Sequence, residues 1–150
     1  MKKYICIILI LSVLMSFAGC HISALEDSNG ESDFTLQTIT EQDILEGMST
    51  TTFMSSSVTL HNTTTYKAKT MSGVKELLSV TLDNEPLDMV VSCEITNGNA
   101  RLVLVVNDEI VHDFALNERN QRFSLAMVSG EVSLKLAGES CGYAVTCTLQ

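Results

Sequence analysis

The sequence predicts an all-β protein, an antiparallel two-sheet sandwich of immunoglobulin-like or jelly-roll-like type that follows a signal peptide and a mostly disordered linker. Two observations predict the fold. Apolar residues alternate with polar ones in successive runs between residues 57 and 149, which is the period of half-buried strands. Turn residues separate these runs about every ten residues without an intervening helical pattern, as in antiparallel sandwiches.

The chain opens with a segment typical of an export signal. Lys2 and Lys3 precede the apolar run YICIILILSVLMSF, and the small pair Ala18-Gly19 follows it. This run is shorter than the roughly 20 apolar residues that cross a bilayer, and a polar acidic tract follows at once, so a permanent membrane helix is the weaker interpretation. We therefore expect residues 1–19 to be a cleaved signal peptide.

The cysteine behind the signal indicates an anchor. FAGC at 17–20 resembles the lipobox of bacterial lipoproteins, although Phe17 stands where an aliphatic residue is usual. The resemblance implies that Cys20 is the lipidation site, and that the mature protein is held by its lipid on the extracytoplasmic face of a bacterial cell membrane. Two or three acyl chains give stable anchoring. The alternative is an ordinary secreted protein whose signal is cut near a cysteine.

The charge distribution predicts a spacer. The chain has a formal net charge of −9, and residues 20–50 carry seven acidic side chains but no Lys or Arg. Such a segment repels an anionic bilayer surface and stays extended. No clustered Lys and Arg residues are available for phosphate contacts, so nucleic acid is excluded as a partner.

Within this linker, residues 20–33 contain few large apolar residues and are expected to be disordered. The stretch TEQDILEGM is either a short helix or more linker. A helix would start at the cap Thr40 with Asp43 reaching back to it, and would end at Gly47.

The β-domain is predicted over residues 51–150. A Ser- and Thr-rich stretch comes first, and its alternation favours a strand from about residue 57. The later apolar positions are Leu78, Val80 and Leu82; Met89, Val91, Cys93 and Ile95; Leu102, Leu104 and Val106; Ile110, His112, Phe114 and Leu116; Phe123, Leu125 and Met127; Val132, Leu134 and Leu136; and Tyr143, Val145, Cys147 and Leu149. Asn97-Gly98, Asn107-Asp108 and Ser129-Gly130 are expected to form tight hairpins between strands.

Three cysteines remain in the mature domain. Cys141 and Cys147 lie too far apart along one extended segment for a local bridge. Cys93 and Cys147 share the apolar parity of their strands, so a disulfide between them across the core is one hypothesis. This disulfide would leave Cys141 as a free thiol. The other hypothesis is three reduced cysteines that pack as small apolar residues.

The sequence offers no catalytic constellation and no metal site, so we expect a protein that is not an enzyme and needs no cofactor. Its three histidines are scattered, and H-x-x-x-H, C-x-x-C and G-x-S-x-G patterns are missing.

The run from Gly98 to Leu149 resembles the C-terminal β-domain of small surface lipoproteins of clostridia and related bacteria. The resemblance rests on N-x-x-x-Q-x-F followed by a hairpin that ends in a small residue and Gly. The matching residues are Asn117, Gln121, Phe123, Ala137 and Gly138. It implies the fold and the location only.

The favoured function is a membrane-tethered, non-enzymatic domain that binds or scaffolds an extracytoplasmic protein or glycan. The alternative is a carbohydrate-binding module or surface adhesin. The composition is poor in the aromatic side chains that stack on sugar rings, with three Tyr, five Phe and no Trp. A hydrolase ranks third. It would need two carboxylates that face one cleft, and no spacing in the sequence indicates such a pair.

Overall fold

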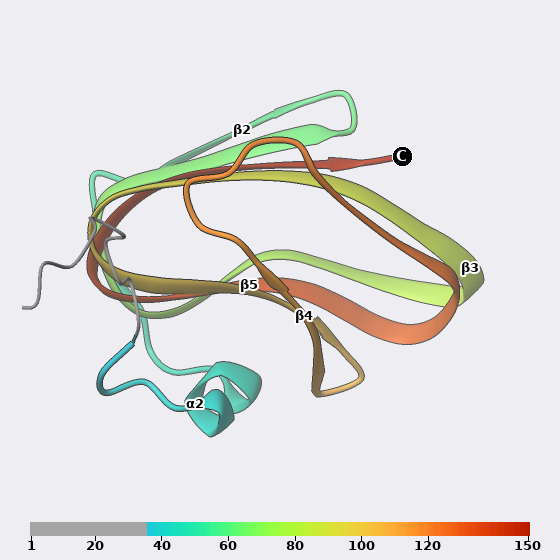
Figure 1. The fold of residues 1–150 in the computed structure, drawn as a ribbon, viewed down its shortest axis with the longest axis horizontal. Helices are drawn as coiled ribbons and strands as arrows, with labels where there is room; N and C mark the ends of the chain where they lie inside the picture. The colour runs from blue at the N-terminus through green and yellow to red at the C-terminus, as the bar shows by residue number, and fades with distance from the viewer. Residues whose placement is uncertain (1–35) are drawn as a thin grey trace, which may run out of the picture. The chain divides into compact units, whose positions relative to one another are not determined.

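The computed structural model of the protein describes residues 36–150. The predicted signal peptide, the predicted lipidation site Cys20 and the first part of the predicted linker lie outside the described residues. The elements in chain order are α2 (Glu41–Glu46), β1 (Thr51–Phe53), β2 (Ser56–Leu60), β3 (Thr63–Val106), β4 (Glu109–Phe114) and β5 (Gln121–Leu149) (Figure 1). This part of the chain is mostly β-strand with antiparallel pairing, which confirms the predicted all-β class.

The strands β3 and β5 are long and sharply bent. β3 runs for 44 residues, and at about 3.3 Å per residue a straight strand of that length would extend about 145 Å. The backbone has positive φ at Gly73 and Gly98 in β3 and at Gly130 and Ser140 in β5. Glycine adopts such angles without steric cost. The two strands therefore fold back on themselves, as Figure 1 shows.

The two long strands pair with each other twice. Residues 63–91 of β3 run antiparallel along β5, from Thr63 opposite Thr148 to Val91 opposite Gln121. Residues 89–106 then pair with the other side of residues 132–149 of β5. Met89 consequently has partners on both sides, Phe123 and Leu149.

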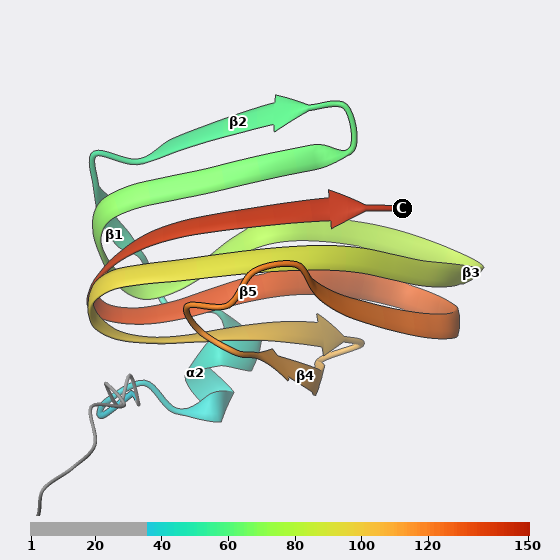
Figure 2. The same cartoon turned by 45° about the horizontal axis from the view of Figure 1, so that its top comes forward.

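This pairing arranges the segments in two rows that belong to one hydrogen-bonded sheet. The first row has the order β2, 63–68, 143–148, 89–95 and 121–123, and the second has the order 74–82, 130–137, 100–106 and β4. Figure 2 shows β2 at the outer edge of the first row, followed by the start of β3 and the end of β5. β1 pairs with residues 70–72, where β3 leaves the first row.

The three predicted hairpins have different outcomes. Asn107 and Asp108 form the two-residue turn between β3 and β4, both with positive φ. The hairpins predicted at Asn97-Gly98 and Ser129-Gly130 are wrong. The residues on both sides of each pair continue in the same long strand and keep pairing with the other one. Positive φ at Gly98 and Gly130, which would suit a hairpin turn, instead bends a long strand.

The main core is formed by the side chains that alternate inward from both rows. Its fully or almost fully buried members include Met71, Met89, Val91, Leu102, Leu104, Val132, Leu134, Leu136, Cys141 and Val145. At one end His112 packs between Phe114 and Phe123, with ring centroids 4.7 Å from each. Most of the predicted apolar strand positions therefore point toward a common interior, whereas Met127 is 62% exposed.

The short helix α2 has the start that the sequence allowed. Thr40 and Asp43 form a reciprocal capping box, and Gly47 follows the last turn with positive φ. Ile44 is 0% exposed and packs with Val74, Val103, Val105 and Ala137 on the second row. The packed part of the chain consequently begins before the predicted domain boundary at residue 51.

The position of α2 explains why residues 101–106 read RLVLVV without alternating. Leu102 and Leu104 face the main core, whereas Val103 and Val105 face the helix, so this strand segment is buried on both faces. Within residues 36–150, no helix has the length and apolar character to cross a bilayer.

Candidate functional site

The first row carries a shallow hollow on the face opposite the main core. Its volume is 330 Å³, and its lining residues are Thr65, Lys67, Ser92, Cys93, Glu94, Arg119, Ala144 and Thr146. Cys93 is buried, as are Val91, Val145 and Cys147, which alternate with the other lining residues of their strands. The alternation of the strands therefore turns the polar lining side chains toward solvent. We call this hollow the sheet-face hollow.

The floor of the sheet-face hollow is lined with hydroxyl groups. The side-chain oxygens of Thr65 and Thr146 lie 3.1 Å apart on neighbouring segments. The next cross-strand pair, Thr63 and Thr148, repeats the contact at 2.8 Å. These threonines form a ladder that fixes the hydroxyl positions, while each hydroxyl keeps capacity for at least one more hydrogen bond.

Opposite charges flank the floor without meeting. Ala144 is the cross-strand partner of both Lys67 and Glu94, one on each side. Lys67 and Glu94 form no ion pair, since both ion pairs among residues 36–150 involve Arg101. The small side chain of Ala144 leaves the space between the two charged groups open.

Arg119 reaches the hollow from the loop between β4 and β5. Three contacts hold this loop on the edge of the first row. The side-chain oxygen of Asn117 accepts from the Ile95 amide at 2.7 Å, and the Glu118 carbonyl accepts from the Cys93 amide at 2.9 Å. The Asn120 amide donates to the Ser92 hydroxyl at 2.9 Å. The loop thus continues the ladder beyond the end of the strand pairing.

The base of the loop is closed by Gln121. Its side-chain amide accepts from the Ala115 amide and donates to the Ala115 carbonyl, both at 2.8 Å. This arrangement explains two positions of the N-x-x-x-Q-x-F pattern, Asn117 and Gln121, as residues that shape the loop. The result is that Arg119 is presented from a fixed backbone.

The three charged side chains of the sheet-face hollow have no ion-pair partner among the described residues. The ion pairs of residues 36–150 both involve Arg101, which contacts Glu41 at 2.9 Å and Asp113 at 2.6 Å. Lys67, Glu94 and Arg119 are exposed and remain available to a ligand. Two cations and one carboxylate around hydroxyl groups suit a polar ligand that carries negative charge.

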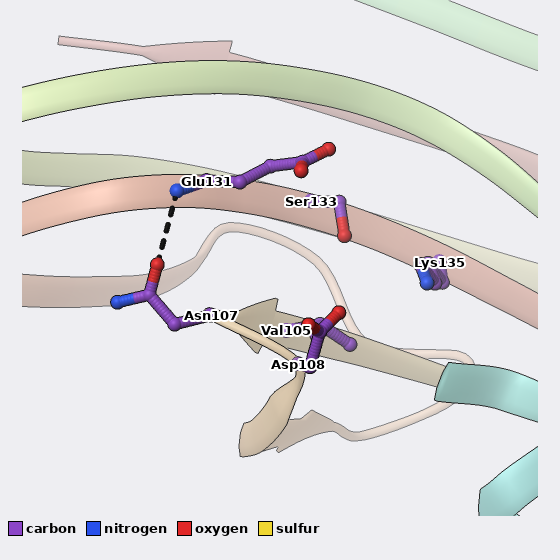
Figure 3. A pocket seen from close by; sticks show the side chains of 6 residues that line it. All are labelled: Val105, Asn107, Asp108, Glu131, Ser133 and Lys135. Atoms are coloured by element: carbon purple, nitrogen blue, oxygen red, sulfur yellow. Dashed lines mark hydrogen bonds between the residues drawn. The ribbon is translucent and has the colours of Figure 1, made fainter. Parts of the chain in front are cut away.

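A second hollow, of 240 Å³, lies on the second row beside α2 and the β3–β4 turn (Figure 3). Its lining residues are Val105, Asn107, Asp108, Glu131, Ser133 and Lys135. The side-chain oxygen of Asn107 accepts from the Glu131 amide at 3.1 Å, and its side-chain nitrogen donates to the Ser129 carbonyl at 2.9 Å. Asn107 therefore ties the turn to β5.

The lysine of this second hollow is also committed to the fold. Lys135 Nζ donates to the carbonyl oxygens of Ile44 and Leu45, at 3.2 and 2.8 Å, at the C-terminal end of α2. A cation there satisfies carbonyls that a helix end leaves without partners. Because its main polar groups hold structure together, the second hollow is the weaker candidate for a ligand site.

The three cysteines of the domain are free and buried. Cys93 lies opposite Val145 and Cys147 opposite Val91, so the two cysteines are diagonal neighbours within the first row. They do not face each other from opposite rows, as the hypothesis of a bridge across the core requires. Diagonal Cβ atoms lie about 7 Å apart, against about 3.8 Å in a disulfide. The bridge stays a prediction, and the register speaks against it.

Burial also makes these thiols unreactive. It raises the pKa of Cys93 to about 12, and the pKa values of Cys141 and Cys147 to about 11. The thiolate is the reactive form, and its population at neutral pH is very small at such pKa values.

Residues 36–150 contain no group of three His, Cys, Asp or Glu side chains placed to hold a metal ion. No protein-family model matches the chain, and no curated protein matches it. Sequence reasoning missed Lys67, Glu94 and Arg119 as candidate site residues. The one available signal was the N-x-x-x-Q-x-F pattern, because Arg119 lies inside it.

Proposed function

We propose that this chain is a lipid-anchored lipoprotein of the extracytoplasmic face of a bacterial membrane, and that its β-domain is a non-enzymatic binding module. The export-type start and FAGC at 17–20 support the location. The observation that carries the binding role is the sheet-face hollow. It gathers three charged groups without ion-pair partners over a hydroxyl ladder, and one of them comes from a loop held by hydrogen bonds.

The domain is a two-sheet sandwich of jelly-roll type. The order of the segments supports this proposal, because the first row has four segments besides β2 and the second row has four. Jelly rolls contain eight strands in two packed sheets. Both long strands pass through both rows, which favours a jelly roll over an immunoglobulin-like arrangement.

The ligand presents an acidic group to Arg119 and Lys67 and donors to Glu94 and the threonine hydroxyls. An acidic segment of an extracytoplasmic protein or an anionic glycan has this chemistry. The alternative function, a carbohydrate-binding module or adhesin, is favoured by the hydroxyl-lined floor. It is opposed by the lack of an aromatic side chain among the residues that line the hollow, since stacking on a ring supplies much of sugar affinity.

The anchor is tested by fractionation of cells that express the full chain or its Cys20→Ser variant. Loss of the thiol removes the attachment point of the lipid, so we expect the variant in the medium and the parent in the membrane fraction. Equal membrane retention of both proteins would contradict the anchor.

The binding role is tested in cells with the full chain. A photo-crosslinking amino acid replaces Arg119 in one variant and Glu109, at the edge of the second row, in a control. We expect a defined crosslinked product only from position 119. Identical products from both positions would refute the hollow as the binding site.

The glycan alternative is tested by affinity electrophoresis of the full chain in gels that contain a uronate polysaccharide or a neutral glucan. Glycan binding predicts that the uronate polymer retards the parent chain and that Arg119→Ala abolishes this retardation. If the parent chain has equal mobility in both gels, a protein segment remains as the proposed ligand.

A further inference from the structure

The strand β2 forms an open edge of the first row. It pairs with residues 63–67 on one side, and all five of its residues are exposed. Val58 is 65% and Leu60 is 69% exposed, which is unusual for apolar side chains in a strand. Phe53 and Met54, just before β2, are also exposed. Among residues 36–150, this edge therefore combines apolar side chains with backbone groups that have no strand partner.

This edge lacks the features that usually prevent strands from pairing with other chains. Such features are charged side chains, proline and bulges on the edge strand. From residue 47 to residue 66 the chain contains no Asp, Glu, Lys, Arg or Pro, although it carries 18 acidic and nine basic side chains in all. The register of β2 with β3 is also regular over its five pairs.

We propose that β2 is a homotypic interface, at which a second copy of this chain adds its own β2 antiparallel across a two-fold axis. A two-fold interface brings the same residues together from both copies. The strand SSVTL has an apolar residue at its centre, so Val58 of one copy meets Val58 of the other. Ser57 then faces Thr59, and Ser56 faces Leu60.

The backbone supports this register. Leu60 and Thr63 flank the two-residue turn between β2 and β3, and the pair that closes such a hairpin is a hydrogen-bonded pair. Because hydrogen-bonded and non-hydrogen-bonded pairs alternate, the backbone groups of Ser57 and Thr59 point to the open side. Pairing centred on Val58 joins them in two reciprocal pairs. It also places the two Val58 side chains in a non-hydrogen-bonded pair, where side chains approach closely.

The lack of charge on this edge suits a second copy as the occupant. Two copies with a formal net charge of −9 repel each other, and the uncharged edge is where they approach at the lowest electrostatic cost. A lipid surface would cover Val58 and Leu60, but it offers no partners for the outward backbone groups of Ser57 and Thr59. A strand of the same chain satisfies both requirements.

Cysteine crosslinking of the full chain tests the register. In Val58→Cys the new thiols of two copies lie directly opposite each other. In the control Ser56→Cys the new thiol is on the same strand and the same face and is also exposed, but it lies four residues from the position opposite its counterpart. We expect several-fold more disulfide-linked dimer from Val58→Cys under mild oxidation. Equal yields from both variants would indicate random collision and would overturn the proposal.

A charge variant separates the second copy from a lipid surface. Val58→Lys places two cations opposite each other, so the proposal predicts loss of dimer in sedimentation of the detergent-solubilised full chain. Val111→Lys, on the exposed side of β4, should leave the dimer intact. Unchanged sedimentation of Val58→Lys would contradict the interface. A flotation assay with phosphatidylcholine vesicles tests the lipid surface on the Cys20→Ser chain. If Val58→Lys lowers vesicle binding and leaves the dimer unchanged, the edge binds lipid and the proposal is wrong.

Discussion

The carboxylate of Glu139 accepts hydrogen bonds from both the backbone amide and the hydroxyl of Thr38, at 2.5 and 2.7 Å, although the two residues lie 101 positions apart. The amides of Gln37 and Ile39 reach the same carboxylate at 3.0 and 3.2 Å. One side chain on the β5 bend thus holds the chain that leads into α2. The hydrogen bonds favour the charged form, and with the Thr38 hydroxyl as the largest cause they lower the pKa of Glu139 to about 2.

The attachment of the segment before α2 should therefore weaken in acid. The pKa of Glu139 is about 2 in the folded protein, against an ordinary value of 4.5, so its contribution is complete above about pH 4.5 and disappears as the pH falls toward 2. We expect hydrogen exchange of the amides of residues 37–39, corrected for intrinsic rates, to accelerate across this range. Glu139→Gln should show weak protection already at pH 7. Protection that is equal in both proteins at pH 7 would refute the role of this carboxylate.

Ile44 should contribute strongly to the stability of the domain. Its side chain is fully buried against the second row, so Ile44→Ala leaves a cavity and is expected to cost about 2–4 kcal/mol. The exposed helix position in Gln42→Ala serves as the control, and its effect should stay below about 0.5 kcal/mol. Urea unfolding of the full chain gives both values. Equal midpoints for the two variants would mean that α2 does not pack on the sheet.

A side chain at Gly130 should destabilise the domain by displacing the side chain of Asn107. Its φ is +112°, and a Cβ there would lie 1.9 Å from the side-chain oxygen of Asn107. Gly130→Ala must therefore displace Asn107 and lose its bonds to the β5 bend. Gly47→Ala is the matched control, because φ is +83° but no atom lies within 4 Å of the added carbon. Thermal unfolding should show the larger loss for Gly130→Ala. A similar loss for both would mean that backbone strain alone decides the effect.

Thiol counting should find three free cysteines in the unfolded, unreduced domain. The register offers no directly opposed pair, and Cys93, Cys141 and Cys147 are all buried away from oxidants. In the folded protein the same reagent should react slowly with all three, since burial raises their pKa values. One free thiol, with peptide mapping that places a bridge between Cys93 and Cys147, would instead support the cross-core disulfide.

The alternation of apolar residues and the turn residues between the runs predicted by themselves a domain of antiparallel strands, because a period of two is a property of the local sequence. The capping residues Thr40 and Asp43 likewise indicated α2, since a capping box closes within one helical turn. The sequence also specified the positions of unusual backbone, such as Gly98 and Gly130. It could not specify whether each closes a hairpin or bends a strand, because both uses need the same positive φ.

Tertiary structure alone decided which distant segments became neighbours. Val103 and Val105 broke the alternation for a reason that appears only when α2 covers the second row. Lys67, Glu94 and Arg119 come from three separate parts of the chain, and their common hollow depends on the double pairing of β3 with β5 and on the loop held by Asn117. Local patterns indicate where strands lie and which of their faces are apolar. What covers each face and the order of the strands follow from long-range pairing that no short stretch of sequence encodes.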